Sequence, residues 1–393
     1  MPRRLPKLNI VLAALLPSML VLGIWLGGHP RWLPDPVADA LLGDDGPRAV
    51  AEGLDIVADR FYRSVDRSQL SDAALDGAVK SLKDRFSTYF SPQEYTAFQE
   101  SVDNRFSGIG VAIRGVRTGL RVETVYDGSP AARAGLRVGD VITAAGGKRL
   151  SGRPEQAAVA LVKGPQATKV TLRLRRGRRT LTKTLTRDEI RIPLVESKTR
   201  RAADRRVEHI ALSTFSSDDA DDQMTRAIRN AKQRGGRGIV LDLRGNGGGL
   251  ITQAQAIASM FLRDGTIVTT RGRAVPERTL SALGEPIAGK LPVVVLVDGG
   301  TASASEIVAG ALQDRKRATV VGTNTFGKGV FQEVVPLPNG GALDITAGQY
   351  FLPSGRNLGG KPIEPDVSAR DDPDTPKRDE ALDRALRVLA GKL

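Results

Sequence analysis

The chain of 393 residues contains no cysteine and only two histidines, His29 and His209. The first absence excludes disulfides, zinc–thiolate sites, iron–sulfur clusters and a cysteine nucleophile. The second excludes a metal site built from several histidines. Any Ser-His-Asp triad would have to depend on one of these two side chains.

Aromatic residues make up only 4% of the chain, which argues against a surface that stacks single-stranded bases. The formal net charge of +14 would by itself permit binding to nucleic acid or to an anionic membrane. The densest basic run, from Arg173 to Arg179, straddles Gly177 as two strands around a tight turn would. We interpret it as the solvated face of a hairpin and expect no nucleic-acid partner.

The amino terminus carries an apolar run from Ile10 to Leu26 that follows three basic residues. This run is at the short end of a membrane-spanning helix, and the basic flank should stay in the cytoplasm. No convincing cleavage site follows, so residues 1–28 are predicted to be a retained signal anchor rather than a cleaved signal peptide. We expect a single-pass protein of the cell membrane whose remainder lies in the periplasm or at the cell surface. A cleaved signal would make it secreted, and a core helix is the other alternative.

The length of the chain suggests two or three domains. A stretch rich in glycine and proline, 29–48, indicates a linker. Apolar residues at helical spacing predict a helical region over 49–104, and a helical tail is expected over 371–393. These terminal helices could pack within the protein or join two copies of the chain.

Short strands separated by glycine turns are predicted from residue 105 to residue 188. The phrase Gly108-Ile109-Gly110-Val111, together with Ser129-Pro130-Ala131 and Gly139-Asp140, resembles a PDZ domain. Such domains bind peptides by strand addition and hold a terminal carboxylate with the backbone N–H groups of the glycine loop. The resemblance implies that Gly108, Ile109, Gly110 and Val111 bind a carboxy-terminal tail. The glycines could also simply make a turn.

From 189 to 370 the sequence alternates buried strands and helices, which predicts a mixed α/β core with parallel pairing. The strand at 239–243 is followed by Gly245-Asn246-Gly247-Gly248-Gly249. The strand at 293–297 leads through Asp298-Gly299-Gly300 into a helix. A further strand is expected over 330–335.

Two glycine patterns suggest nucleotide sites, and neither fits well. The segment from Gly322 to Gly329 has glycine where a P-loop needs Ser or Thr, and a strand rather than a helix is expected to follow it. The segment from Gly245 to Leu250 lacks the third glycine of a dinucleotide site, and its predicted location outside the cytoplasm argues against that chemistry.

Ser303 is the better candidate for chemistry, because it falls between a buried strand and a helix amino terminus. Free N–H groups and the helix dipole favour negative charge at such a place. Ser303 could therefore attack a carbonyl while the N–H of Ala304, with a second N–H from the glycines at 247–249, binds the oxyanion. The bare pattern favours helix capping as the role of Thr301, Ser303 and Ser305.

A base for this serine could be His209 or Lys328. His209 lies in a predicted strand, where a single histidine is more typical of packing. Lys328 would have to lose its proton through burial, because a lysine in water titrates near 10.4. Its glycine neighbours could provide a dry setting, and Gln332 could orient the amine if the chain bends suitably.

Four phrases complete a family resemblance. Thr301-Ala302-Ser303-Ala304-Ser305-Glu306 and Phe326-Gly327-Lys328-Gly329 closely resemble the C-terminal processing peptidases, also called tail-specific proteases, of the S41 Ser-Lys type. The glycine-rich strand exit after Leu241 and the run from Gly359 to Val367 match as well. The resemblance extends from about residue 49 to residue 388, in the family's order of anchor, helices, PDZ domain and catalytic core.

The resemblance implies a serine endopeptidase that cleaves proteins near apolar carboxy-terminal tails, with no metal or organic cofactor. It implies Ser303 as nucleophile, Lys328 as general base and Gln332 as the partner of the lysine. It further implies that Gly249 and Ala304 form the oxyanion hole. At Lys163 the family usually has arginine, so communication between the PDZ domain and the core could differ here.

The expected fold is therefore α/β mixed: a membrane anchor and helices, an α+β PDZ domain, and an α/β protease core. An inactive PDZ scaffold that only binds tails is the alternative, although both Ser303 and Lys328 are present. A PDZ-containing trypsin-like protease does not fit, because its catalytic domain would precede the PDZ domain and would need a histidine.

Overall fold

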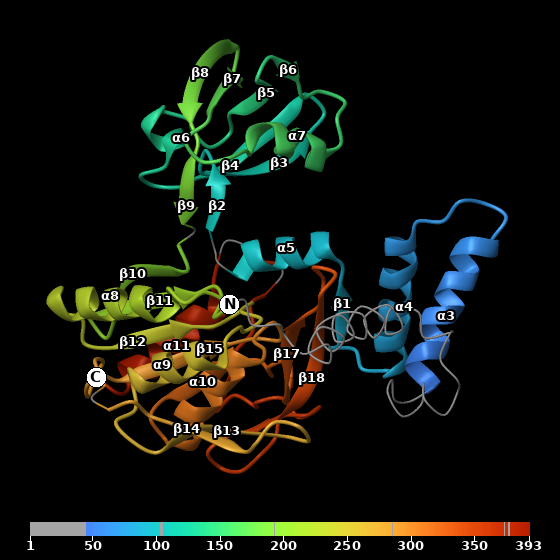
Figure 1. The fold of residues 1–393 in the computed structure, drawn as a ribbon. Helices are drawn as coiled ribbons and strands as arrows, with labels where there is room; N and C mark the ends of the chain where they lie inside the picture. Colours follow the sequence, from blue (N-terminus) through green and yellow to red (C-terminus); the bar gives the residue numbers. More distant parts are fainter. Residues whose placement is uncertain (1–44, 103–104, 192, 285, 373, 376–377) are drawn as a thin grey trace, which may run out of the picture. The chain divides into compact units, whose positions relative to one another are not determined.

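The computed structural model describes residues 45–102, 105–191, 193–284, 286–372, 374–375 and 378–393 (Figure 1). The predicted anchor and most of the predicted linker lie outside these residues. None of the helices in the described ranges has the length and apolar character needed to cross a membrane. The chain divides into two units, one ending at Leu82 and one beginning at Lys83.

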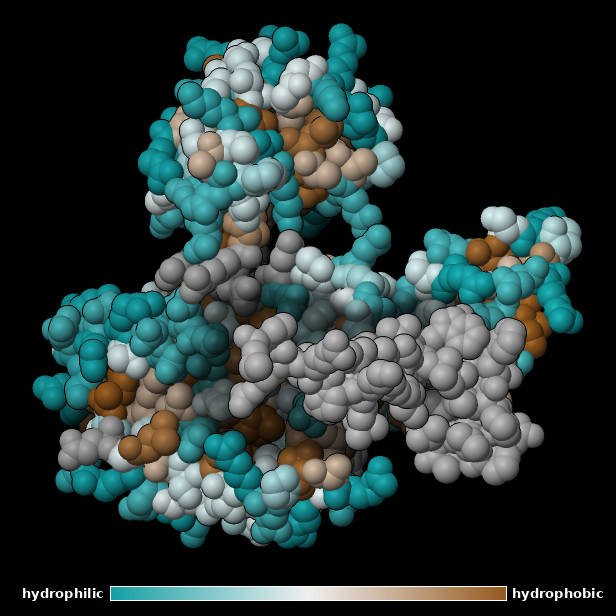
Figure 2. Space-filling model, viewed as in Figure 1, coloured by the Kyte–Doolittle hydropathy of each residue, from teal (hydrophilic) through white to brown (hydrophobic). Residues whose placement is uncertain are grey.

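The first unit holds the helices α3 (Asp45–Arg60) and α4 (Arg67–Ser81). Helix α3 includes the last four residues of the expected linker, 45–48. The N-cap of α4 is Asp66, whose carboxylate accepts the N–H of Ser68 at 2.8 Å. Apolar side chains are exposed over this unit in Figure 2. They include Val50, Ile56 and Val57 on α3, and Phe61 and Tyr62 directly after it.

The expected PDZ domain is a small sheet with the strand order β3-β4-β5-β7-β8, to which β6 is added beside β5. Its elements are β3 (Val111–Val116), β4 (Gly119–Val125), α6 (Pro130–Arg133), β5 (Val141–Ala145), β6 (Lys148–Arg149), α7 (Glu155–Val162), β7 (Lys169–Arg176) and β8 (Arg179–Thr186). Residues such as Leu120, Ile142 and Leu172 form its core. The basic run is the predicted hairpin, because β7 and β8 pair along their whole length around Gly177.

A two-stranded ladder closes the PDZ domain at its base. Strand β2 (Arg105–Gly108) pairs antiparallel with β9 (Asp188–Arg191), and the two strands bring the entering and leaving chains together. Strand β3 lies at an edge of the PDZ sheet, and no strand of the described residues covers its outer side. A peptide could therefore add there.

The expected α/β core is built on a six-stranded sheet of order β10-β11-β12-β15-β16-β19. All of its pairs are parallel except β10 with β11, which confirms the predicted parallel α/β core. Its elements are β10 (Val195–Ala202), β11 (Arg205–Leu212), α8 (Ala220–Gln233), β12 (Ile239–Asp242), α9 (Ile251–Ser259), β15 (Val293–Val297), α10 (Ala304–Asp314), β16 (Thr319–Gly322), β19 (Val367–Ser368) and α11 (Glu380–Ala390).

Helices cover both faces of this sheet, because its strands are apolar on both sides. On β12, Ile239 and Leu241 pack with residues of α8, α9 and α10, whereas Val240 packs with α11. Helix α11, expected as a tail, is thus part of the core, and its Leu382, Ala385 and Leu389 are buried. The apolar face that could have joined two copies is covered by the chain's own sheet.

A second, five-stranded sheet has the order β1-β18-β13-β14, with β17 also paired to β18. Its strands are β1 (Thr88–Phe90), β13 (Thr266–Gly272), β14 (Arg278–Ser281), β17 (Val330–Pro336) and β18 (Ala342–Phe351). Strand β1 corrects the prediction of a purely helical region over 49–104: these residues pair with β18, a partner far away in sequence, before α5 (Pro92–Val102) begins.

We predict that Leu389→Ala lowers the free energy of unfolding by about 2–5 kcal/mol, because it leaves a cavity beneath α11. Leu389 is fully buried, whereas Arg387 on the same helix is exposed. Arg387→Ala should therefore change stability by no more than about 0.5 kcal/mol. Urea unfolding of the two variants makes the comparison, and equal stabilities would show that α11 is a detachable tail.

Candidate active site

Ser303 occupies the N-cap of α10, directly after the loop that leaves β15. Its backbone has φ 55° and ψ −118°. This conformation is disfavoured for a residue with a side chain and costs about 1–3 kcal/mol. The strained turn places the serine at the positive end of a buried helix, where developing negative charge is stabilised.

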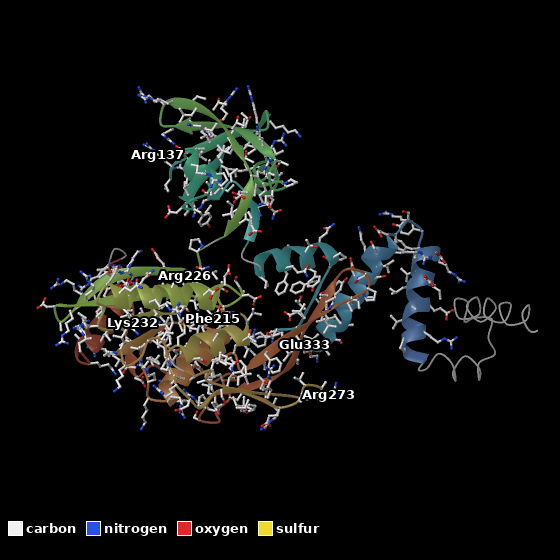
Figure 3. All side chains as sticks on the ribbon, turned by 60° about the vertical axis from the view of Figure 1, so that its left-hand side comes forward. Arg137, Phe215, Arg226, Lys232, Arg273 and Glu333 are labelled. Atoms are coloured by element: carbon white, nitrogen blue, oxygen red, sulfur yellow. The ribbon has the colours of Figure 1, made fainter. Side chains whose placement is uncertain are left out.

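The glycine-rich loop after β12 lies against this turn. A Cβ on Gly248, whose φ is +99°, would come within 2.8 Å of the Ser303 Cβ and 2.9 Å of the Ala304 nitrogen. Only glycine permits this approach. Gly249 forms a parallel bridge to Phe215, a fully buried residue that Figure 3 labels.

Two backbone N–H groups beside the serine are unused. The N–H of Gly248 donates to the side-chain oxygen of Asn246 at 2.9 Å. The N–H groups of Gly249 and Ala304 have no acceptor among the residues that the structure describes. These are the two groups that the family resemblance assigns to the oxyanion hole, and their freedom supports that assignment.

The neighbouring hydroxyl groups hold the loops together rather than cap α10. The hydroxyl of Ser305 donates to the carbonyl of Asn246 at 2.9 Å, and that of Thr301 donates to the carbonyl of Leu243 at 2.8 Å. The Ala302 N–H also donates to the Asn246 carbonyl, at 3.0 Å. The capping interpretation therefore does not account for Thr301 and Ser305.

Glu306 joins the serine loop to the lysine loop. Its fully buried carboxylate accepts the N–H of Ser303 at 2.9 Å and the N–H of Lys328 at 3.0 Å. It also accepts the Gly327 N–H at 2.8 Å and the Thr325 hydroxyl at 2.5 Å. No role was predicted for Glu306. The capping-box spacing of a Ser followed three residues later by a Glu was the available signal.

Lys328 precedes β17, so the segment before it does not open a helix and is not a P-loop. The Lys328 amine donates to the side-chain oxygen of Gln332 at 2.6 Å, as predicted. The required bend is present, because the β17–β18 register shifts between Phe331 and Gln332. Burial lowers the pKa of Lys328 from its ordinary value, against the charges of Asp344, Asp84 and Glu306.

No hydrogen bond joins the Ser303 hydroxyl to the Lys328 amine within the described ranges. The carboxylate of Glu306 accepts the backbone N–H groups of both residues. The two side chains are not hydrogen-bonded to each other. The arrangement therefore has a serine at a helix terminus, two free N–H groups and a partly buried amine whose hydrogen-bond partner is a neutral amide.

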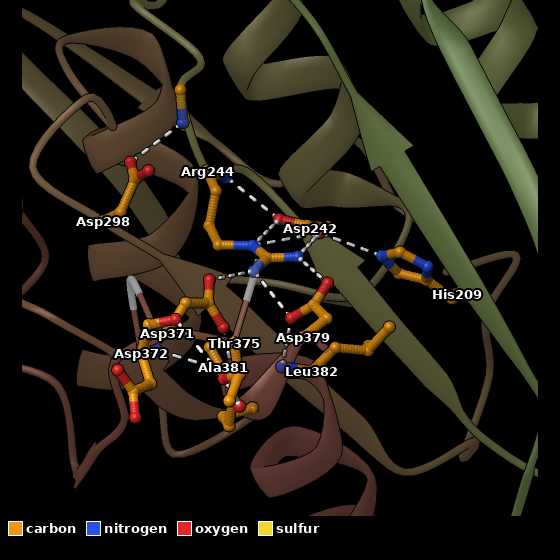
Figure 4. Close-up of polar contacts among 12 residues, drawn as sticks. His209, Asp242, Arg244, Asp298, Asp371, Asp372, Thr375, Asp379, Ala381 and Leu382 are labelled. Atoms are coloured by element: carbon orange, nitrogen blue, oxygen red, sulfur yellow. Dashed lines mark hydrogen bonds and ion pairs between the residues drawn. The ribbon is translucent and has the colours of Figure 1, made fainter. Parts of the chain in front are cut away.

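His209 belongs to a different network, shown in Figure 4. Its Nε2 lies 2.9 Å from a carboxylate oxygen of Asp242, which also binds the guanidinium of Arg244 at 2.7 Å. Burial acts to raise the pKa of Asp242, but hydrogen bonds from His209 and Arg244 outweigh it and lower the pKa. Arg244 continues to Asp379, the N-cap of α11, so this network anchors that helix.

The predicted peptide-binding residues run from the last residue of β2, Gly108, to the first residue of β3, Val111. The N–H groups of Ile109 and Gly110 have no acceptor in the described part of the chain, which suits carboxylate binding. Gly110 has φ +78° and packs against Ser129. Lys163 ends α7, and its ammonium lies 5.6 Å from the ring centre of Phe106 on β2.

Fold and site together define a serine-peptidase core joined to a PDZ domain. The model of Peptidase family S41 matches residues 206–369, and a PDZ domain model matches residues 121–176. The chain is 37% identical over 319 residues to the carboxy-terminal-processing protease of Bartonella bacilliformis, which covers 79% of the chain and 72% of that relative. The chain belongs to peptidase family S41, among its C-terminal processing peptidases.

Two more comparisons agree. The "Probable CtpA-like serine protease" of Staphylococcus aureus strain COL is 35% identical over 319 residues, 81% of this chain. The chain spans 62% of the length of that relative. The structure of the photosystem II D1 C-terminal processing protease superposes with a TM-score of 0.51 at 30% identity, covering 86% of this chain and 90% of that one.

We predict that Glu306→Gln lowers the free energy of unfolding by about 1–3 kcal/mol, because whichever way the amide turns, its NH₂ group faces donors. Labelling of Ser303 by a fluorophosphonate probe should slow in parallel. Glu364→Gln, at an exposed carboxylate, is the control. Wild-type stability and labelling in Glu306→Gln would mean that this carboxylate does not hold the two loops together.

Proposed function

We propose that the chain is a serine endopeptidase that cleaves proteins near their carboxy-terminal tails through an acyl-enzyme on Ser303. The neutral amine of Lys328 takes the Ser303 proton as the hydroxyl oxygen attacks the substrate carbonyl. The N–H groups of Gly249 and Ala304 bind the resulting oxyanion. The ammonium then gives its proton to the leaving amine, and water hydrolyses the ester.

The observation that carries this proposal is the environment of the Lys328 amine. Its hydrogen-bond partner is the neutral amide of Gln332 rather than a carboxylate. Burial lowers the pKa of the amine, so a larger fraction is unprotonated near neutral pH than for a lysine in water. A base that works without histidine fits a chain in which His209 binds Asp242 instead.

The PDZ domain is proposed to bind the substrate's carboxy terminus. The open edge of β3 would pair with the tail, and the N–H groups of Ile109 and Gly110 would bind its carboxylate. The basic flank and apolar run at the amino terminus support a membrane-anchored enzyme whose catalytic part lies outside the cytoplasm.

Ser303→Ala and Lys328→Ala should each lower kcat/KM for a tailed protein substrate by at least about 10³-fold. The controls are Ser354→Ala and Lys290→Ala, at exposed residues away from the site. Unfolding midpoints should show that all four variants fold. Cleavage by Lys328→Ala would remove the lysine from the mechanism, and cleavage by Ser303→Ala would remove the serine. No cleavage by the wild-type protein would favour the alternative of an inactive tail-binding scaffold.

A substrate whose carboxy terminus is amidated should be cleaved with a kcat/KM about tenfold or more below that of the free acid, because charge-assisted hydrogen bonds are lost. Amino-terminal acetylation of the same substrate is the control and should have little effect. Equal cleavage of acid and amide would count against carboxylate binding by the PDZ domain.

A further inference from the structure

The side chain of Gln332 is held at both ends. Its oxygen accepts from the Lys328 amine at 2.6 Å, and its nitrogen donates to the hydroxyl of Thr346 at 3.1 Å. Thr346 stands opposite Gln332 in the β17–β18 ladder, so the two side chains leave the same face of the sheet. The Thr346 hydroxyl donates to the carboxylate of Asp84 at 2.5 Å.

The carboxylate of Asp84 determines which group donates and which accepts in each of these hydrogen bonds. Burial acts to raise the pKa of Asp84, but the hydrogen bonds from Ser87 and Thr346 outweigh it and lower the pKa. An ionised carboxylate can only accept. The single hydroxyl proton of Thr346 therefore points to Asp84, and its oxygen must accept from Gln332. This turns the amide oxygen of Gln332 toward Lys328.

The segment 84–87 contacts the lysine in a second way. The ring of Phe86 lies with its centre 5.0 Å from the Lys328 ammonium nitrogen. The guanidinium of Arg85 lies over the same ring at 4.6 Å and over that of Phe326 at 5.3 Å. The segment 84–87 therefore reaches the amine in two ways. Asp84 acts through Thr346 and Gln332, and the ring of Phe86 contacts the amine directly.

We propose that Asp84 is a positioning residue for the catalytic lysine and acts through a relay, Asp84–Thr346–Gln332–Lys328. The inference rests on the proposed function, because it takes Lys328 as the base. A neutral amine that gives one N–H to the Gln332 oxygen keeps its lone pair free for the serine proton. A reversed amide would offer N–H donors to that lone pair and occupy it.

Variants of Asp84 and Thr346 should affect the Lys328 amine differently, because only Asp84 carries a charge. Asp84, Asp344 on β18 and Glu306 on α10 all favour the ammonium form, and burial opposes them. Replacing Asp84 by Asn removes one of these charges, so the amine should deprotonate at a lower pH. Replacing Thr346 by Val breaks the relay but leaves every charge in place.

The test is the pH dependence of kcat and KM for a tailed substrate. Thr346→Val should lower kcat by about 10- to 100-fold with little change in KM, and the acid limb of the profile should stay in place. Thr346→Ser keeps the hydroxyl and should recover most of the rate. Asp84→Asn should lower kcat and move the acid limb to lower pH. The matched control is Thr279→Val, whose exposed hydroxyl pairs with Thr269 in the same sheet.

Wild-type kcat in Thr346→Val would overturn the relay while the dependence of cleavage on Ser303 and Lys328 kept the proposed function. If the wild-type protein cleaves no tailed substrate, the proposed function fails, and the relay is judged on the Lys328 amine itself. Amine-selective labelling of Lys328 at high pH, followed by mass spectrometry, should then be slower in Thr346→Val than in wild type, because a reversed Gln332 amide occupies the lone pair of the amine. An equal rate would overturn the relay.

Discussion

The structure of the site depends on one buried carboxylate. Glu306 has no exposure to solvent, and its charge is acceptable in the interior only because donors surround it. Those donors come from two loops, at Ser303 and at Thr325 to Lys328. Separating the loops would leave the carboxylate without partners. The hydrogen bonds that offset the burial of this carboxylate therefore also hold the backbones of Ser303 and Lys328 close to each other.

The proposed nucleophile and the proposed oxyanion donors come from one edge of the parallel sheet. Strands β12 and β15 are neighbours and run in the same direction, so the loops that follow them meet. The glycine-rich loop lies so close to Ser303 that a side chain on Gly248 would collide with it. Asn246 links the two loops by accepting from Ala302 and Ser305.

The proposed base comes from the other sheet. Lys328 leads into β17, and its partner Gln332 faces Thr346 across the antiparallel ladder to β18. The segment that precedes β1 completes this environment through Asp84 and Phe86. Asp84 lies two residues beyond Leu82, at the beginning of the second unit.

The sequence by itself determined the order of the PDZ and α/β regions, the parallel strands, and Ser303, Lys328 and Gln332 as candidates. These follow from local patterns, because apolar runs, glycine turns and an i, i+4 pair lie within a few residues of one another. Tertiary structure alone decided the contacts of Glu306, Asp84 and Thr346, the pairing of β1 with β18 and the burial of α11. The Thr346–Asp84 hydrogen bond joins residues 262 positions apart. Such contacts form only when the chain has folded, since no local pattern encodes which distant donor will meet which carboxylate.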